Sequence, residues 1–438
     1  MDKLFDLRWL AIPLIGLTVG IGYFTQQSDF WPLFIQYGFF FVFFALIFRF
    51  SKTQPTLLFF IFVSILLRFI LIFTFPNLSD DFYRFVWDGR LLINGYNPFD
   101  YLPTHYIHND FSINGINPTL FDELNSPEYF TIYPPVPQGV FASACWLFPN
   151  NILASVMVMK SLVFLFELGS LFFIKKILDH HQLSSRNILL YALNPLIIIE
   201  LSGNLHFEAA MIFFLLASIY FLTKKENWIF SAIAMGFAIA SKLLPLIFLP
   251  FLIRRLGWKK SFQYFSVVGI TVLALFAPLL SEVFINNFKN SLDLYFQKFE
   301  FNASIYYLLR WVGYRVVGYN WIQEAGPALG LVVFIGVIIM VLLEKKLTWK
   351  ILFEKMLFAI CLYLAMTPVV HPWYLSLPIL LTIFTRFRFP ILWSFLIYLT
   401  YVNYSYSEYF ESLWIVGIEY ILVFSYFIYE FYLKKIRA

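Results

Sequence analysis

Apolar runs of about 20 residues recur along the whole chain, and they constrain its fold more than any other feature. At ~1.5 Å per residue, a helix of that length crosses the ~30 Å hydrocarbon core of a bilayer. Only 13% of the residues are charged, which is about half the share in a soluble domain. We therefore expect an all-α, polytopic integral membrane protein that forms a single domain over residues 1–438.

The lysines and arginines gather in short clusters between the apolar runs, as the positive-inside rule expects of cytoplasmic loops. The net charge of +5 therefore does not indicate a nucleic-acid partner. The pattern predicts about 14 spans with both termini in the cytoplasm. The spans are expected at residues 9–25, 31–49, 55–76, 152–174, 188–202, 207–222, 228–240, 243–253, 260–281, 324–343, 352–367, 372–385, 389–403 and 412–433.

Two long segments between the predicted spans are expected on the non-cytoplasmic side, and the first holds most of the candidate chemistry. Val136–Phe148 follows it and is too short to cross, so we expect a membrane-embedded or juxtamembrane helix there. The single domain is accordingly divided into N-terminal spans (1–76), a first non-cytoplasmic loop with juxtamembrane helices (77–135), core spans (136–281), a second non-cytoplasmic loop (282–323) and C-terminal spans (324–438).

The first loop opens with two adjacent carboxylates, Asp80 and Asp81, just after the apolar run that ends at Pro76. The spacing predicts a helix over 80–94, on which Asp80, Arg84 and Asp88 share one face. Acidic residues at a helix start also suit the helix dipole, and charges four residues apart are ordinary surface pairs. The position at a bilayer edge, among arginines and aromatic residues, favours a functional site.

This segment resembles the first-loop signature of bacterial GT-C superfamily mannosyltransferases, and it is similar to the eukaryotic enzyme that adds the first mannose to GPI anchors. The resemblance rests on ordered motifs between residues 80 and 245, and His371-Pro372-Trp373-Tyr374 adds a weak match. The ordered motifs are Asp80–Phe99, Tyr133-Pro134-Pro135 with Gln138, Asn194-Pro195, Gly203–Glu208 and Ser241–Pro245. The GPI family has an Asp-x-Asp spacing where this chain has adjacent aspartates, so the resemblance leaves open which of the two is the base.

The resemblance implies a catalytic role for Asp80 and Asp81 and transfer, with inversion, from a polyprenyl-phosphate-mannose donor. Such a reaction needs a base for the acceptor hydroxyl and positive charge on the departing phosphate. It also needs an apolar groove for the isoprenoid tail. We expect substrate-binding roles for Arg84, Trp87, Asp88, Arg90, Tyr133, His206, Glu208, Lys242 and His371.

Several of these residues have a plain structural reading as well. His206 and Glu208 suit an interfacial pair that caps a helix, and Lys242 could extend to the interface. His371 lies in a Pro-flanked turn, where a lone histidine is more often structural. Arg68, Lys160 and Glu167 lie inside predicted spans, and we expect a structural salt bridge among them.

No cofactor is required by these patterns. Asp80 and Asp81 are the candidate ligands if Mg²⁺ or Mn²⁺ takes part, and the sequence has no His/Cys cluster with transition-metal spacing. The expected partners are the lipid bilayer, a polyprenyl-phosphate sugar and a glycan or glycolipid acceptor.

The first alternative is the same enzyme class with another hexose or pentose. The second is a lipid-linked-sugar flippase or transporter. Such a protein is expected to have charged residues along a path through the bilayer and two repeated halves. The sequence shows no internal repeat. Short cationic loops and the lack of organelle signals favour a bacterial inner membrane, with the active site on the non-cytoplasmic face.

Overall fold

The computed structural model describes residues 6–108, 111–297, 299–406 and 410–436. These residues form an all-helical protein, as the apolar pattern predicts, and they hold no strand. A single isolated bridge pairs Phe301 with Val369. Helices named α are α-helices, and those named η are 3₁₀ or π helices.

Seven helical stretches are long and apolar enough to cross a membrane. They are Leu7–Phe24 (η1 Leu7–Leu10, α1 Ala11–Val19 and η2 Gly20–Phe24), α2 (Phe30–Phe50), α3 (Gln54–Leu71), α8 (Ile152–His180), Trp258–Leu279 (α13 Trp258–Phe276 and η6 Ala277–Leu279), α16 (Ile322–Leu342) and Leu413–Tyr432 within α20 (Leu413–Ile436).

The centre of the molecule is built from shorter helices. They are η3 (Ser185–Ile188), α9 (Leu189–Ala192), η4 (Ile197–Gly203), α10 (Glu208–Thr223), α11 (Trp228–Ser241), η5 (Leu244–Phe248), α12 (Pro250–Leu256), α17 (Trp349–Met366), η7 (Pro372–Leu375), α18 (Ser376–Thr382), α19 (Phe389–Leu396) and η8 (Ile397–Tyr404). An eighth span results if η4 and α10, which meet at a bend of 110°, are counted as one. The protein is thus polytopic, and the count of about 14 spans stays a prediction.

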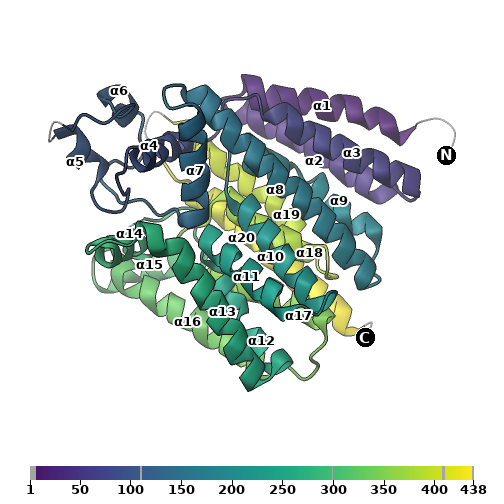
Figure 1. Cartoon of the computed structure of the whole chain (residues 1–438). Coiled ribbons are helices and arrows are strands. Elements are labelled where there is room, and N and C mark those ends of the chain that lie inside the picture. Colours follow the sequence, from purple (N-terminus) through teal and green to yellow (C-terminus); the bar gives the residue numbers. More distant parts are fainter. Residues whose placement is uncertain (1–5, 109–110, 298, 407–409, 437–438) are drawn as a thin grey trace.

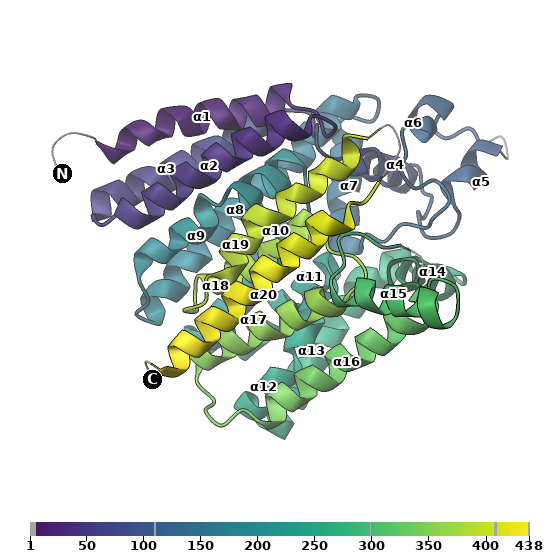
Figure 2. The same ribbon diagram turned by 180° about the vertical axis from the view of Figure 1, so that it is seen from behind.

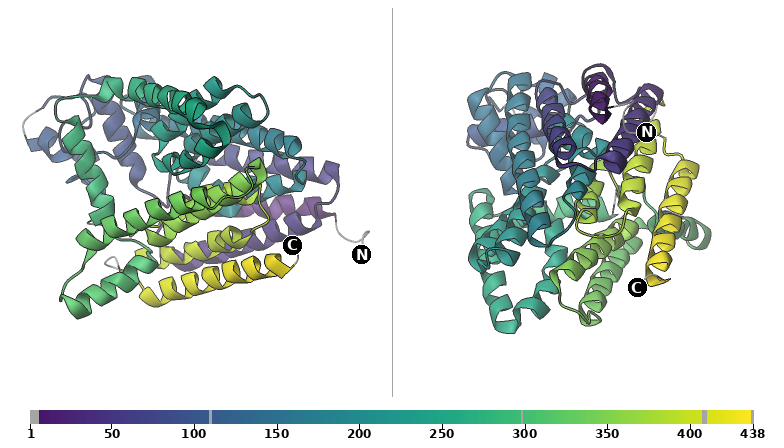
Figure 3. Two further views of the ribbon diagram at one scale, coloured as in Figure 1. Left: turned by 90° about the horizontal axis from the view of Figure 1, so that it is seen from below. Right: turned by 90° about the vertical axis from the view of Figure 1, so that its right-hand side faces the viewer.

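The two segments expected to form the long loops lie at one end of the helical body (Figures 1 and 2). The first carries α4 (Asp81–Ile93), α5 (Pro103–His108) and α6 (Pro118–Asp122) and leads into α7 (Pro135–Leu147), and the second carries α14 (Phe284–Gln297) and α15 (Ile305–Val316). The chain's first described helix begins, and α20 ends, at the opposite end, which the side view also shows (Figure 3, left).

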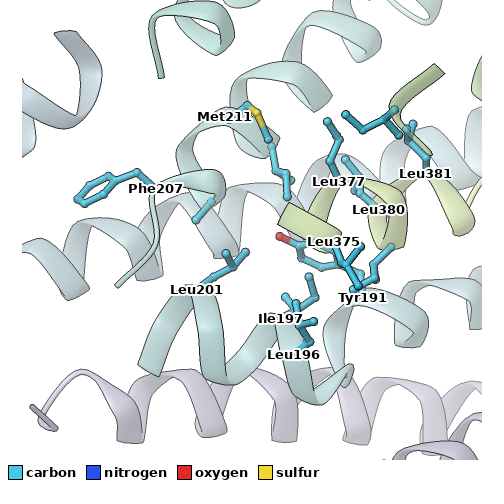
Figure 4. Packing of buried hydrophobic residues seen from close by; sticks show 14 of the residues in the cluster. Tyr191, Leu196, Ile197, Leu201, Phe207, Met211, Leu375, Leu377, Leu380 and Leu381 are labelled. Carbon is cyan, nitrogen blue, oxygen red and sulfur yellow. The ribbon is translucent and has the colours of Figure 1, made fainter. Parts of the chain in front are cut away.

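Buried aliphatic side chains from η4, α10, η7 and α18 gather in one layer, where Ile197 and Leu201 lie close to Leu375 and Met211 (Figure 4). This packing joins the N-terminal and C-terminal halves. The predicted buried ion pair forms nearby: Arg68 Nε lies 2.9 Å from Glu167 Oε2, and both side chains are inaccessible to solvent. Lys160 does not join it, because its Nζ donates to the Leu71 and Thr74 carbonyl oxygens at 3.1 and 2.8 Å.

Candidate active site

Helix α4 positions the two adjacent aspartates. Asp80 is its N-cap residue and Asp81 its first residue, so both side chains lie at the N-terminal end of the helix. The opposite side of α4 packs closely against α7. A Cβ at Gly89 would lie 2.5 Å from the Phe141 carbonyl oxygen, so this contact requires glycine.

The shared face predicted for α4 is present, but its Arg84 and Asp88 side chains form hydrogen bonds to the first loop and to α7. Arg84 Nε donates to Asp88 Oδ1 at 2.9 Å, and Arg84 Nη1 donates to the carbonyl oxygens of Ser126 and Tyr129 at 3.3 and 2.9 Å. The buried Asp88 also accepts hydrogen bonds from Thr131 Oγ1 and Gln138 Nε2, at 2.5 and 2.9 Å. Arg84 and Asp88 therefore tie α4 to the 126–131 segment and to α7.

Arg90 and Trp87 also serve the packing of α4. Arg90 Nη1 donates to the Gly115 carbonyl oxygen at 2.6 Å, and the Trp87 ring is fully buried. Burial lowers the pKa of Arg90 from its usual value. Among the described residues, Trp87, Asp88 and Arg90 line neither of the two cavities at this end of the molecule.

Asn125 bridges the two aspartates. Its Nδ2 donates to Asp80 Oδ1 at 2.8 Å and to Asp81 Oδ1 at 3.0 Å. Asp80 is exposed at the rim and Asp81 is half-buried. Neighbouring protein atoms exclude part of the water from the Asp80 carboxylate, and this desolvation raises its pKa. The Asp81 charge raises the pKa further, while the hydrogen bond from Asn125 lowers it. The sequence offered no signal for Asn125, which is one polar residue in a polar loop.

Two cavities meet beside Asp81. The first, of about 380 Å³, is lined by Asp80, Asp81, Asn125, Arg84, Tyr401 and Phe301, among others. The second, of about 360 Å³, is lined by Asp81, His206, Glu208, Lys242 and several leucines of the Leu243–Ile247 segment. Their shared lining residues are Asp81, Ile132, Tyr133, His371 and Trp373.

Lys242 and Glu208 face each other in the second cavity. The Lys242 Nζ contacts Glu208 Oε1 as an ion pair and lies 4.2 Å from the centre of the Tyr374 ring. The Lys242 side chain is 28% exposed, whereas Glu208 is 4% exposed. Lys242 ends α11 in an extended conformation, and η5 begins two residues later with Pro245 in its first turn. The break predicted around Lys242 is therefore confirmed.

Stacked rings form the wall between the cavities. The Trp373 ring lies 3.8 Å from the His206 ring and 4.4 Å from the His371 ring, which in turn stacks on Phe301 at 4.6 Å. Burial, with smaller effects of Lys242 and His206, lowers the pKa of His371 to about 3, so its ring is neutral at physiological pH. The structure thus brings His206 and His371 together through Trp373, which sequence reasoning named only within a weakly matching motif.

The described residues hold no group of three or more His, Cys, Asp or Glu side chains placed to share a metal ion. Two carboxylates next to each other, Asp80 and Asp81, are the oxygen donors that Mg²⁺ prefers. Both already accept a hydrogen bond from Asn125.

Comparison with known proteins places this arrangement in a family. Searches of curated proteins and of solved structures returned no significant match. The family described as alpha-(1→6)-mannopyranosyltransferase, N-terminal domain, matches residues 39–257, which is half of the chain. The matched region runs from α2 to α12 and includes Asp80, Asp81, Tyr133, His206, Glu208 and Lys242.

The family match confirms the resemblance to mannosyltransferases, and the similarity to the GPI enzyme stays a prediction. A site with two carboxylates beside a cavity that holds a lysine, within a membrane protein, agrees with glycosyl transfer. The chain belongs to the alpha-(1→6)-mannopyranosyltransferase family and is a membrane glycosyltransferase.

Proposed function

We propose that this enzyme transfers a mannosyl residue from a polyprenyl-phosphate donor to a glycan or glycolipid acceptor, with Asp81 as the general base. The observation that carries the proposal is the position of Asp81, which borders both cavities, whereas Asp80 borders only the first. A base must reach the acceptor hydroxyl while that hydroxyl faces the donor sugar.

The donor fits the second cavity in this proposal. Leu243, Leu244 and Leu246 supply an apolar wall for an isoprenoid tail, and Leu246 is 46% exposed at the outer side of the protein. Among the described residues that line this cavity, Lys242 is the one lysine or arginine. It is therefore the proposed partner for the phosphate: it pairs with Glu208, but 28% of its side chain stays exposed, and Arg84 and Arg90 do not line this cavity.

The acceptor fits the first cavity. Tyr129, Tyr401 and Trp373 line it with aromatic side chains of the kind that bind sugars. The acceptor oxygen forms a bond to C1 of mannose as the bond from C1 to the phosphate oxygen breaks. The hydroxyl proton passes to the Asp81 carboxylate, and the phosphate leaves with its negative charge beside Lys242.

The family description supports an α-(1→6) product, so we propose a primary hydroxyl of the acceptor as the nucleophile. Inversion from a β-linked donor follows from the predicted GT-C resemblance. The two long polar segments lie at one end of the molecule, and the start of the first described helix and the end of α20 lie at the other (Figure 1). Together with the charge bias of the loops, this supports a site on the non-cytoplasmic face of a bacterial inner membrane.

The test is in vitro transfer by the purified protein from a panel of polyprenyl-phosphate sugars to glycan and glycolipid acceptors, followed by linkage analysis. We expect mannose in an α-(1→6) linkage, from the mannose donor only. Product from a glucose or arabinose donor alone would show that the enzyme transfers that sugar and not mannose. Movement of a lipid-linked sugar across vesicles without any new glycosidic bond would instead support the flippase alternative.

The same assay with a chelator tests the metal. We expect transfer to persist in EDTA, because the described residues place no three carboxylate, histidine or cysteine side chains together for a metal ion, and because Lys242 is the proposed partner of the phosphate charge. Loss of activity that returns with Mg²⁺ or Mn²⁺ would place a cation at Asp80 and Asp81.

A further inference from the structure

Glu200 is a fully buried carboxylate in the middle of the protein that the motifs did not single out. It lies in η4, a π helix, and its side chain forms no ion pair with an arginine or lysine in the part of the chain that the structure describes. Ionisable groups in a membrane protein's interior are costly and usually have a function. π helices are also frequent at functional sites.

Each oxygen of Glu200 has its own partners. Oε1 accepts a hydrogen bond from the Tyr401 hydroxyl at 2.9 Å. Oε2 accepts one from Asn204 Nδ2 at 3.0 Å, and it lies 3.5 Å from His206 Nε2. The carboxylate thus accepts hydrogen bonds from two distant parts of the chain, Tyr401 in η8 and Asn204 just after η4, and it lies against His206 without a hydrogen bond.

These partners lead to different cavities. Tyr401 lines the first cavity and His206 lines the second. The His206 ring stacks on Trp373, which lines both. Glu200 itself is not among the described residues that line either cavity, so it acts on the site only through these neighbours.

We propose that Glu200 is a positioning residue that fixes one wall of each cavity. It thereby keeps the acceptor cavity and the donor cavity correctly placed relative to Asp81. The inference rests on the proposed function, because it takes the two cavities to be the two substrate sites. It goes beyond that function by assigning a shared support to both sites.

A carboxylate suits this position because both of its oxygens are acceptors, and both are used. Methionine has nearly the same volume but no carboxylate oxygen. In Glu200→Met, therefore, the Tyr401 hydroxyl and the Asn204 amide both lose their acceptor, whereas glutamine would keep both contacts because its NH₂ can donate to the tyrosine hydroxyl. Both walls then lose this support, and the geometry that both substrates need is lost.

The test uses the full-length enzyme in the mannose-transfer assay, with KM measured separately for donor and acceptor. Glu200→Met is expected to raise both KM values by about tenfold, the effect of losing one hydrogen bond to a charged group on each side. Tyr401→Phe keeps the ring and removes only its hydroxyl bond, so it is expected to raise the acceptor KM and leave the donor KM within twofold.

Glu167→Met is the matched control. This carboxylate is equally buried and also accepts from a tyrosine, since the Tyr191 hydroxyl donates to Oε1 at 2.5 Å. It lies on neither cavity among the described lining residues. We expect Glu167→Met to lower the melting temperature without raising either KM, because it affects only the contacts with Arg68 and Tyr191.

The outcomes separate the two proposals. Transfer by the wild type with unchanged KM values in Glu200→Met, or an unchanged acceptor KM in Tyr401→Phe, would overturn the role of Glu200 alone. Equal KM increases in Glu167→Met would also overturn it, because a general loss of stability would then explain the effect. No transfer by the wild type would overturn the proposed function, and this inference with it.

Discussion

The two adjacent aspartates have different surroundings although they are neighbours in the sequence. Asp81 borders both cavities, and Asp80 lies exposed at the rim of the first, with its pKa raised mainly by the protein atoms around it. The sequence alone could not separate them, because helical spacing places both in the first turn. The distinction comes from Asn125 and from the cavity walls, which are built by residues far away in the chain.

Asn125 is expected to hold the aspartates in place. Asn125→Ala removes the hydrogen bonds to both carboxylates and should lower kcat about tenfold while changing either KM less than threefold, because the bond to Asp81 is one hydrogen bond to a charged group at the proposed base. Steady-state kinetics checks this. Asn117→Ala is the control in the same loop: it removes the N-cap of α6, so it should cost about 1 kcal/mol of stability but leave kcat unchanged. Equal kcat losses in both variants would contradict a specific role for Asn125.

The α4–α7 contact is the element on which the site depends. Gly89→Ala would place a Cβ 2.5 Å from a backbone oxygen of α7, so the two helices must separate. We expect the free energy of unfolding to fall by about 1–3 kcal/mol, which a lower melting temperature in detergent would show. Gly139→Ala, in α7 itself, places its Cβ in open space and should have little effect. A melting temperature for Gly89→Ala equal to that of Gly139→Ala would refute the close contact.

The break after α11 places Lys242 in the second cavity. Lys242→Ala should raise the donor KM about tenfold or more and leave the acceptor KM nearly unchanged, because a charged contact to the phosphate is lost. Donor titrations check this. Lys224→Ala is the control: this exposed lysine also ends a helix and lies over a tyrosine ring, but it lines neither cavity among the described residues. An unchanged donor KM in Lys242→Ala would remove Lys242 from the site.

At the level of elements, the sequence predicted α4 within a residue or two and the short helix α7, because Pro and Gly punctuate both. It also predicted the break at Lys242. The partners of Arg84 and Arg90 could not be predicted, since carbonyl oxygens of a distant loop leave no pattern in the sequence. In the structure these arginines donate hydrogen bonds to the loop, so we propose Lys242 as the residue that contacts the phosphate.

For the whole molecule, the apolar pattern predicted an all-helical membrane protein but not how its centre is built. Residues 188–253 and 372–404 appear in the sequence as short spans, and they form broken helices buried among longer ones. Hydropathy reports burial, and burial in a protein core looks the same as burial in lipid. The number of spans therefore could not be read from the sequence alone.

The arrangement of the two ends can be tested in intact cells. Cysteines at Tyr101 and Tyr319, both exposed at the α4–α6 and α14–α15 end, should react with an impermeant thiol reagent. A cysteine at the exposed Trp258, where α13 begins, should react only after lysis. The native Cys145 is buried, and the chain without added cysteines gives the background. The reverse labelling pattern would place the site on the cytoplasmic face.

The central claim is that Asp81, at the junction of the two cavities, takes the proton of the acceptor hydroxyl. The most direct measurement is single-turnover mannose transfer by Asp81→Asn and Asp80→Asn, each compared with the wild type. We predict that Asp81→Asn lowers the single-turnover rate by about 10²–10⁴-fold with substrate binding retained, and that Asp80→Asn lowers this rate by a smaller factor. Wild-type turnover in Asp81→Asn, or a larger loss in Asp80→Asn, would contradict the assignment.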